Sequence, residues 1–550
     1  MNDDQLTIGS IAERALRQYP DQVVVTARGP SVSAMTYGDL FERVYRLVRA
    51  LRALGVQPGD RVATVAWNHR RHLELYLAVP CMGAVLHTIN LRLHEDQVAD
   101  IVAHAGDTVV VVDEDCLPVV GVATRSARCV RHWVVLRDDA PGPLPDGVAW
   151  LDYEELLADQ EPKELALDGR VDERAPAAMC YSSATTGKAK GVVYSHRAIY
   201  LHSMMLGLAD TWGISEWDTA LVVVPMFHVN AWGIPYASVW MGAKLVLPGV
   251  RPRAADLAAL LHSEQVTFTA GVPSVWAEVA ENLRTSGVAL PHLRLVVSGG
   301  APLSPKLLDA GRQAGLPIIH SYGMTEASPL VLVGGPGPAL QGEPEDVVRS
   351  AMLAQGRLVP GLAMSVRDEY GHDVPRDGMT TGELWLKGPW IADGYVRDPR
   401  SAAAFSEGWY RTGDVVTVDR RGYVRVVDRE ADLIKSGGEW ISTIDVENAI
   451  LDLAGVRGAA VVGVPDERWQ ERPVAFVVLD EPLEQDAIRR HLRQKVPRWW
   501  VPDEVVVVEE IPLTSVGKTD KKELRRRWHV DAGGTSRAEP AATVPQQVQT

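Results

Sequence analysis

The feature that most limits how this chain can fold is an alternation of short apolar, β-branched segments with longer amphipathic segments over residues 1–428. Residues 61–65, 108–112 and 293–297 are short runs dominated by Val and Leu, as in buried strands. Residues 40–54 instead repeat their apolar positions at helical spacing. Because strands that alternate with helices favour parallel sheets, we expect an α/β fold, with a large N-terminal domain of mainly parallel sheets layered with helices.

A second, smaller pattern begins after residue 428. It predicts a small α+β C-terminal domain over residues 433–530, joined to the first domain through residues 429–432. Residues 531–550 have no periodicity and are predicted to be a disordered tail. The elements expected in the small domain are helices at 443–453 and 483–495 and strands at 459–464, 473–479 and 504–509.

The charge and the cysteines limit the environment of the protein. A formal net charge of -15 argues against a nucleic-acid or anionic-membrane partner, because both favour a basic face. The four cysteines are widely spaced, without a C-x-x-C pair, which is typical of a reducing cytoplasm. The acidic start M-N-D-D-Q lacks the apolar core of a secretory signal. We therefore expect a cytoplasmic protein.

Residues 221–249 are strongly apolar and long enough to cross a bilayer. The stretch also contains His228, Asn230 and Lys244, together with prolines and glycines, which a membrane span rarely tolerates. We therefore expect no membrane span and assign the stretch to buried strands and turns of a large core.

Residues 181–190 read Y-S-S-A-T-T-G-K-A-K and are rich in groups that bind phosphate. Hydroxyls and turn N–H groups donate to phosphate oxygens, and a lysine adds positive charge, so the segment predicts a polyphosphate-binding loop. The common P-loop pattern is not met, because Ser182 and Ala189 stand where it requires Gly and Ser or Thr. Taken alone, the segment is also typical of a polar turn between two strands.

Further motifs follow this loop: S-G-G-A-P at 298–302, H-S-Y-G-M-T-E at 320–326, Y-R-T-G-D at 410–414, D-R-E-A-D-L-I-K-S-G-G-E-W-I-S at 428–442 and P-L-T-S-V-G-K at 512–518. In this order they resemble the adenylate-forming superfamily of acyl-CoA synthetases, firefly luciferases and peptide-synthetase adenylation domains. The resemblance covers almost the whole chain. Within the superfamily, the chain is most similar to medium- and long-chain fatty-acid-CoA ligases.

The nucleotide site follows partly from the pattern and partly from the resemblance. Open α/β sheets bind ligands at the carboxyl ends of their strands, where the segments 293–297 and 316–319 lead into glycine-containing motifs. The resemblance implies that Asp414 and Arg429 hold the ribose, although Asp414 alone is also typical of a turn or helix N-cap. The residues that it implies in ATP and AMP binding are Ser182, Ser183, Thr186, Gly187, Lys190, Gly299, Gly300, Ala301, Ser321, Tyr322, Gly323, Met324, Thr325, Asp414, Val426 and Arg429.

The resemblance also implies catalytic and metal positions. Glu326 and Thr185 match the magnesium position, and Mg²⁺ needs few protein ligands when a triphosphate supplies the rest. Lys518 matches the lysine that offsets the charge of the acid's carboxylate and the α-phosphate. Taken alone, Glu326 is typical of a solvated acid at a helix start, and Lys518 of a solvated basic run. The implied catalytic residues are Lys518, Glu326, Thr185 and His228.

The expected reaction joins a carboxylic acid to ATP as an acyl-adenylate and then transfers the acyl group to coenzyme A. The resemblance implies ATP, Mg²⁺ and coenzyme A as cofactors, a medium-to-large apolar acid as substrate and, as for many fatty-acid members, a homodimer. His228 and Trp232 are equally typical of core residues. The residues implied at the acyl site are His228, Val229, Trp232 and Gly323, and those implied at the coenzyme A site are Gly437, Gly438, Glu439 and Trp440.

Three alanines depart from the family pattern and leave alternatives open. Ala184 and Ala189 replace a glycine and a proline of the phosphate loop. The resemblance implies that the C-terminal domain is mobile about a hinge at residues 429–432, in which Ala431 occupies a position where Asp or Lys is usual. This suggests an adenylation-biased enzyme that passes its acyl-adenylate to a partner ligase or carrier protein. A non-catalytic nucleotide- or acyl-binding protein and an oxidative luciferase are further alternatives; Lys518 and Glu326 argue against the former.

Overall fold

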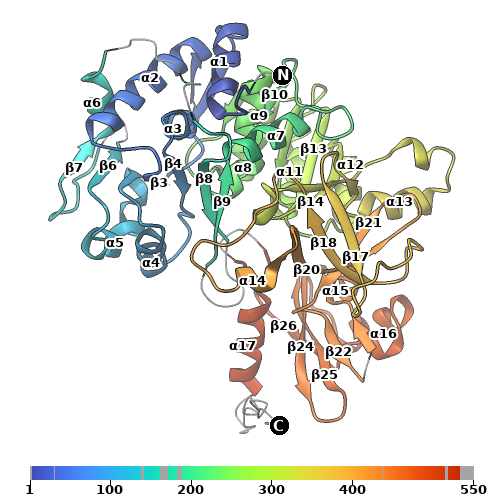
Figure 1. Cartoon of the computed structure of the whole chain (residues 1–550). Coiled ribbons are helices and arrows are strands. Elements are labelled where there is room, and N and C mark those ends of the chain that lie inside the picture. The colour runs from blue at the N-terminus through green and yellow to red at the C-terminus, as the bar shows by residue number, and fades with distance from the viewer. Residues whose placement is uncertain are drawn as a thin grey trace. The chain divides into compact units, whose positions relative to one another are not determined.

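The computed structural model describes residues 3–29, 31–137, 141–161, 167, 171–182, 189–437, 439–514 and 518–532. The chain divides into two units, whose elements are labelled in Figure 1. The first unit contains Met1–Ala431 together with Ser515–Lys518, of which Lys518 is described. The second contains Asp432–Thr514 and the residues from Thr519 onward. Most of the predicted tail, from residue 533, lies outside the described residues.

A seven-stranded sheet carries the strands that flank the predicted phosphate loop. Its strands are parallel except for β9, which runs antiparallel to β8. The run V-V-V-V-D of β5 is buried along its whole length, as expected for a parallel strand covered on both faces. The order in the sheet is β7 (Trp150–Asp152), β6 (His132–Leu136), β5 (Val109–Asp113), β3 (Arg61–Val65), β4 (Val85–Thr88), β8 (Pro176–Tyr181) and β9 (Gly191–Ser195).

A nine-stranded sheet forms the rest of the centre of the first unit. It is parallel from β14 to β1 and ends in antiparallel strands at both edges. The order is β16 (Arg357–Leu358), β15 (Leu330–Val333), β14 (Ile318–Gly323), β13 (Leu295–Gly299), β12 (Phe268–Gly271), β10 (Thr219–Leu221), β11 (Lys244–Leu247), β1 (Val23–Arg28) and β2 (Ser31–Thr36).

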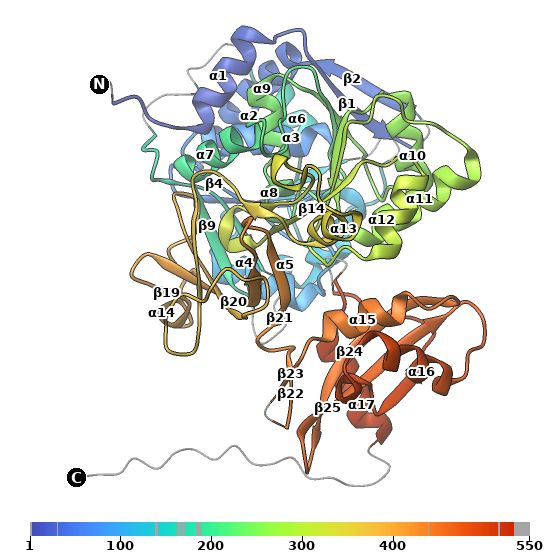
Figure 2. The ribbon, with the colours of Figure 1, turned by 90° about the vertical axis from the view of Figure 1, so that its right-hand side faces the viewer.

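Helices cover both faces of this sheet. Leu245 and Leu247 of β11 belong to one apolar core and Val246 to another, because successive strand residues point to opposite faces. The helices α10 (Ala254–Ser263), α11 (Pro273–Ser286) and α12 (Pro305–Gln313) lie together on the Val246 face (Figure 2). The helices that share the Leu245 core are α1 (Ile8–Gln18), α2 (Tyr37–Ala53), α3 (Arg70–Cys81), α7 (His196–Leu206) and α9 (Ile234–Met241).

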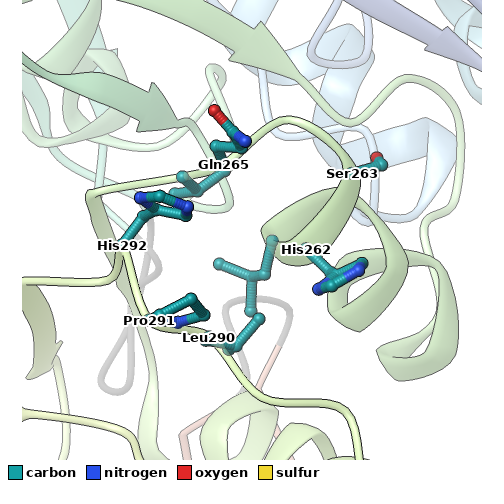
Figure 3. A pocket seen from close by; sticks show the side chains of 8 residues that line it. His262, Ser263, Gln265, Leu290, Pro291 and His292 are labelled. Atoms are coloured by element: carbon teal, nitrogen blue, oxygen red, sulfur yellow. The ribbon is translucent and has the colours of Figure 1, made fainter.

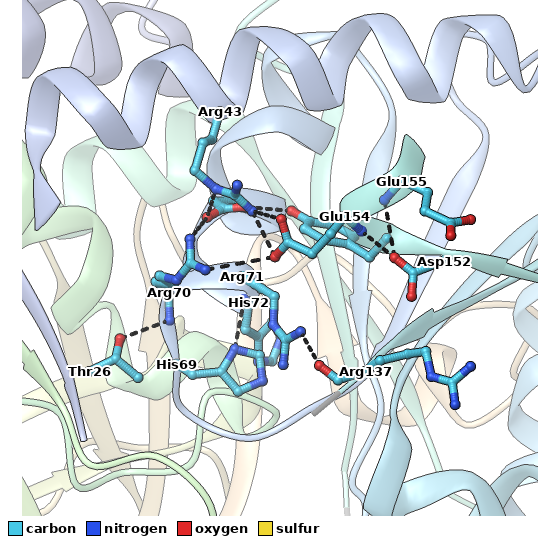
Figure 4. Close-up of polar contacts among 12 residues, drawn as sticks. Thr26, Arg43, His69, Arg70, Arg71, His72, Arg137, Asp152, Glu154 and Glu155 are labelled. Atoms are coloured by element: carbon cyan, nitrogen blue, oxygen red, sulfur yellow. Dashed lines mark hydrogen bonds and ion pairs between the residues drawn. The ribbon is translucent and has the colours of Figure 1, made fainter. Parts of the chain in front are cut away.

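A buried ion-pair network fastens α2 to α3 and to α6 (Tyr153–Ala158), as Figure 4 shows. The Arg43 guanidinium lies 2.7 Å from Glu74 Oε1 and 2.8 Å from Glu154 Oε2. Glu74 is fully buried, and the Tyr153 hydroxyl donates to its second carboxylate oxygen at 2.6 Å. A carboxylate in such a place is tolerated only while it is paired, so this network ties the three helices together.

The remaining sheet of the first unit is antiparallel and contains β17 (Ala363–Arg367), β18 (Gly382–Lys387), β19 (Phe405–Ser406), β20 (Trp409–Val418) and β21 (Val424–Arg429). Its register pairs Asp414 of β20 directly with Arg429 of β21. The first unit also contains α4 (Glu95–Ala105), α5 (Gly121–Ser126), α8 (Val229–Trp232), α13 (Glu345–Leu353), α14 (Ser401–Ala404) and the 3-10 helices Glu114–Val120, Thr325–Ala327 and Pro338–Leu340.

The second unit is a small sheet covered by helices. Its strands are β22 (Ile434–Ser436), β23 (Glu439–Ile441), β24 (Val456–Asp466), β25 (Gln470–Leu479) and β26 (Glu504–Val507). Its helices are α15 (Thr443–Leu451), α16 (Gln485–Lys495), α17 (Lys521–Ala532) and the 3-10 helix Arg498–Trp500.

The predicted fold class is confirmed, with local differences. The helix predicted at 40–54 begins earlier, at Tyr37, because Thr36 and Asp39 form a capping box at its start. The stretch 221–249 is not made of strands and turns alone, since it includes the buried helix α9, whose apolar residues on all sides hide its helical period. Among the described helices, none is both long and apolar enough to cross a membrane.

Candidate active site

The predicted phosphate loop leaves β8 and returns in β9. Residues 183–188 lie outside the described residues, and with them the predicted Ser183, Thr185, Thr186 and Gly187 as well as Ala184. The two ends of the loop are fixed to each other, because the Ser182 N–H donates to the Lys190 carbonyl at 2.9 Å. The Lys190 N–H also lies 3.4 Å from Ser182 Oγ, so Ser182 and Lys190 extend the contact between β8 and β9.

The ends of β13 and β14 bring predicted nucleotide residues side by side. Gly299 pairs with Ser321, and a Cβ at Gly299 would lie 2.9 Å from the Ser321 carbonyl oxygen and 3.2 Å from the Trp232 ring. Gly300 follows with φ +80°, a conformation that glycine adopts without strain. Glycine is therefore needed here for close approach, and the predicted Gly299, Gly300, Ser321 and Trp232 come together.

The turn after β14 carries the remaining residues of the H-S-Y-G-M-T-E motif. A Cβ at Gly323 would lie 2.3 Å from the Pro329 carbonyl, to which the Met324 N–H donates at 3.1 Å. The Tyr194 hydroxyl donates to the Thr325 carbonyl at 2.8 Å. The Ala301 carbonyl oxygen lies 3.3 Å from Nε2 of His320, and burial lowers the pKa of His320. These backbone contacts hold the turn against β9 and the start of β15.

Asp414 and Arg429 meet as the register of β20 and β21 requires. Arg429 Nε lies 3.4 Å from Asp414 Oδ1, and the Tyr322 hydroxyl donates to Asp414 Oδ2. Burial, followed by the charge of Asp414, raises the pKa of Tyr322 well above its usual value, so the phenol stays a donor. The predicted Val426 lies on β21, where its N–H donates to Gln355 Oε1 at 2.6 Å.

Glu326 and Lys190 are linked by a tyrosine that the sequence analysis did not select. Glu326 is 9% exposed, and the Tyr395 hydroxyl donates to its Oε1 at 2.8 Å. Lys190 Nζ lies 4.5 Å from the centroid of the Tyr395 ring. Tyr395 is far from both residues in sequence, and only its place after Gly394 is a local signal, so the pattern gave no reason to choose it.

Lys518 lies beside Gly300, with Cε 3.9 Å from the position of a Cβ on that glycine. Burial and the charge of Arg429 lower the pKa of Lys518 to about 8, against the opposing charges of Asp414 and Glu326. The ammonium group is therefore half-neutral near pH 8 and still mostly charged at pH 7. The structure thus brings Lys518 together with Gly300, Asp414, Arg429 and Glu326.

Two of the residues predicted at the acyl site, Val229 and Trp232, belong to a turn with left-handed backbone conformation. Val229, Asn230, Ala231 and Trp232 have φ between +45° and +57°, although none is glycine. Such residues cost about 1–2 kcal/mol each, and strain of this kind gathers at functional sites. The half-buried His228 precedes the turn, and burial, with the charges of Lys518 and Arg92, lowers its pKa to about 3. His228 is therefore neutral at working pH.

The predicted coenzyme A residues belong to the second unit. Gly437 has φ +62°, and a Cβ there would lie 2.8 Å from the Trp469 ring. Trp440 pairs with Lys435 across β22 and β23, is 48% exposed and has Lys435 Nζ 5.5 Å from its ring. Its neighbour Glu439 is exposed, and Gly438 lies outside the described residues. Ala431 is the last residue of the first unit before the chain enters the second unit at Asp432.

Two further observations concern a hollow and possible metal-binding clusters in the described part of the chain. A hollow of about 260 Å³ between the end of α10 and the segment before β13 is lined by residues such as His262, Gln265 and His292 (Figure 3), and includes none of the predicted residues. Within the described ranges, no three His, Cys, Asp or Glu side chains are grouped to hold a metal.

Comparison with known proteins agrees with this geometry. Residues 12–396 match the family profile described as AMP-binding enzyme, and residues 445–518 match its C-terminal domain. The chain is 43% identical over 539 residues to the long-chain-fatty-acid-CoA ligase of Thermus thermophilus, covering 97% of this chain and 98% of that protein. It is 38% identical over 536 residues to the medium-chain-fatty-acid-CoA ligase of Ectopseudomonas oleovorans, with 96% and 97% covered.

A solved structure extends the comparison to the fold. The anthranilate CoA ligase AuaEII in complex with anthranoyl-AMP superposes with a TM-score of 0.86 at 24% identity, covering 97% of this chain and 99% of that chain. At this identity the likeness concerns the fold alone. The predicted family resemblance and fold class are confirmed.

Proposed function

The chain belongs to the AMP-binding enzymes and is an acid-CoA ligase, and on this premise we propose that it activates a medium- or long-chain apolar carboxylic acid. The observation that carries the proposal is the full-length similarity to two fatty-acid-CoA ligases. The surroundings of His228 support it, because Val229, Ala231 and Trp232 are buried and apolar and His228 itself is neutral. Buried apolar side chains beside the proposed reaction centre suit an acid whose only charge is its reacting carboxylate.

In the proposed first step, the carboxylate oxygen attacks the α-phosphorus of ATP and pyrophosphate leaves. The Lys518 ammonium offsets the charge that builds as the two anions approach. Asp414 and Arg429 hold the ribose, while Gly299, Gly300 and Ala301 line the adenine pocket and Tyr322 lies against the base. No protein nucleophile is required, so positioning and charge neutralisation supply the catalysis.

The donor set fits magnesium as a companion of the triphosphate. Glu326 offers a buried carboxylate, which is a hard oxygen ligand, and the absence of a three-residue cluster among the described side chains suits an ion held mainly by phosphate oxygens. When bound, Mg²⁺ would neutralise charge on the leaving pyrophosphate. Thr185, in the phosphate loop, is the second proposed ligand.

In the proposed second step, the thiol of coenzyme A attacks the acyl carbon of the adenylate and AMP leaves. We assign Gly437, Gly438, Glu439 and Trp440 to coenzyme A binding. The exposed Trp440 ring, with Lys435 beside it, offers an aromatic face and a positive charge to a nucleotide phosphate.

A panel of carboxylic acids tests the proposal. Enzyme, ATP and Mg²⁺ are incubated with acids of increasing chain length and with aryl acids, with and without coenzyme A, and acyl-adenylate and acyl-CoA are measured separately by mass. We expect both products from medium- or long-chain acids. Turnover confined to short or aryl acids would contradict the proposed substrate class.

A further inference from the structure

The segment between β18 and α14 joins two parts of the site that are distant in sequence. The Ala392 N–H donates to the Glu326 carbonyl at 2.8 Å, which fixes the segment to the turn that contains the proposed metal ligand Glu326. The Val396 N–H donates to the Gly191 carbonyl at 2.9 Å, and Tyr395 forms a β-bridge with Val192. The segment is therefore fixed both to Glu326 and to the strand that ends the phosphate loop.

Tyr395 lies in the middle of this segment and is 7% exposed. Its hydroxyl donates to Glu326 Oε1 at 2.8 Å, while Lys190 Nζ lies 4.5 Å from its ring centroid. The Phe405 ring packs edge-on against the Tyr395 ring, with centroids 5.2 Å apart. The backbone N–H of Tyr395 donates to Ser401 Oγ at 2.9 Å. With its ring and its backbone both fixed, Tyr395 has little freedom to move away from either charged partner.

The two ends of Tyr395 suit two different charges. A phenol hydroxyl is a good donor to a carboxylate, and a hydrogen bond to Oε1 fixes the rotation of the Glu326 side chain so that Oε2 is presented in one direction. The face of the ring attracts a cation, which holds the Lys190 ammonium without neutralising it. A direct Lys190–Glu326 ion pair would instead consume both charges that a magnesium–triphosphate complex needs.

We propose that Tyr395 is a positioning residue that holds Lys190 and Glu326 apart and oriented, ready for the triphosphate and its metal. The inference rests on the proposed function and adds a residue to it. The hydroxyl acts through Glu326 and therefore on the metal, whereas the ring acts through Lys190 and therefore on the phosphate. The two contributions are separable by two substitutions at one position.

The experiment compares Tyr395→Phe and Tyr395→Leu with the unmodified enzyme by isothermal titration with ATP, once with Mg²⁺ and once with EDTA. We expect Tyr395→Phe to weaken Mg·ATP binding by about three- to tenfold, because the hydrogen bond to Glu326 is lost, and to leave metal-free ATP binding unchanged, because the ring beside Lys190 is kept. Tyr395→Leu should weaken both, by about three- to tenfold for metal-free ATP, because the ring is also lost.

The control is Tyr423→Phe, which removes a buried hydroxyl that donates to the Gly335 carbonyl at 3.0 Å elsewhere in the same unit. It should leave both affinities unchanged. Equal Mg·ATP binding by Tyr395→Phe and the unmodified enzyme would overturn the proposal. So would equal losses with and without Mg²⁺ in both Tyr395 variants accompanied by a lower melting temperature, since that pattern indicates a purely structural role. Failure of the unmodified enzyme to bind Mg·ATP would instead overturn the proposed function itself.

Discussion

Lys518 allows a quantitative prediction, because its pKa lies within the range of an ordinary pH titration. Burial and Arg429 lower that pKa to about 8 from the usual 10.5. The charged form, which the first step requires, is then about 90% populated at pH 7, about 50% at pH 8 and about 10% at pH 9 in the free enzyme. We therefore expect kcat/KM for adenylation to fall with a midpoint near pH 8 and to approach a tenfold loss per pH unit above pH 9.

The assay is the rate of acyl-adenylate formation without coenzyme A, measured from pH 6 to pH 10 at low acid concentration, so that kcat/KM reports the free enzyme. Lys518→Arg is the matched variant, because a guanidinium stays charged throughout this range. Its activity should be lower at pH 7, since the group is larger, but should lose the alkaline decline. Lys518→Ala should lose about 10²–10³-fold at pH 7.

Unfolding driven by Lys518 does not produce the same decline. Because the pKa of Lys518 is lower in the folded chain than in the unfolded chain, the unfolded chain binds more protons between about pH 8 and 10.5. The contribution of Lys518 to stability therefore rises with pH across that window while its activity falls. An alkaline decline that is identical in the Lys518→Arg variant would refute the assignment of the decline to Lys518.

Four other predictions follow from single contacts. Gly299→Ala should lower ATP affinity by about 5–100-fold, measured by titration, because the new Cβ would lie 2.9 Å from the Ser321 carbonyl oxygen. Normal affinity would contradict the requirement for glycine at this position. Glu74→Ala should destabilise the first unit by about 1–3 kcal/mol in urea unfolding, because the buried Tyr153 hydroxyl would lose its acceptor while Arg43 keeps Glu154; an unchanged free energy of unfolding would contradict this. His228→Gln should leave the shape of the rate profile between pH 5 and 7 unchanged, because the pKa of His228 is about 3; an acid limb lost in the variant would count against it. Ala431→Lys should raise the ratio of acyl-CoA to released acyl-adenylate, and an unchanged ratio would remove the hinge hypothesis.

The sequence was sufficient for those parts of the site that local pattern determines. Glycines at strand ends predicted the close approach at Gly299 and Gly300, because a single missing side chain marks such a position. The shared ribose role of Asp414 and Arg429 was expected only from the resemblance, and their contact was not predicted, since no rule of spacing reveals that β20 and β21 pair with those residues opposite. Tyr395 was missed for a related reason: its two partners come from separate strands and turns, and a tyrosine after a glycine has many ordinary explanations.

The turn at Val229–Trp232 shows why sequence reasoning fails where function places strain. Val and Trp strongly disfavour positive φ, and only Asn230 tolerates it well, so local preference predicts an extended or right-handed segment here. Val229, Ala231 and Trp232 together cost about 3–6 kcal/mol in this conformation, which their burial must offset. The Trp232 ring lies 3.2 Å from the position that a Cβ on Gly299 would occupy, so this turn places the ring beside the strand end that carries Gly299. The chain thus holds an unfavourable conformation where residues of the proposed acyl site lie beside residues of the proposed nucleotide site, and a local conflict of this kind is itself a sign of a functional position.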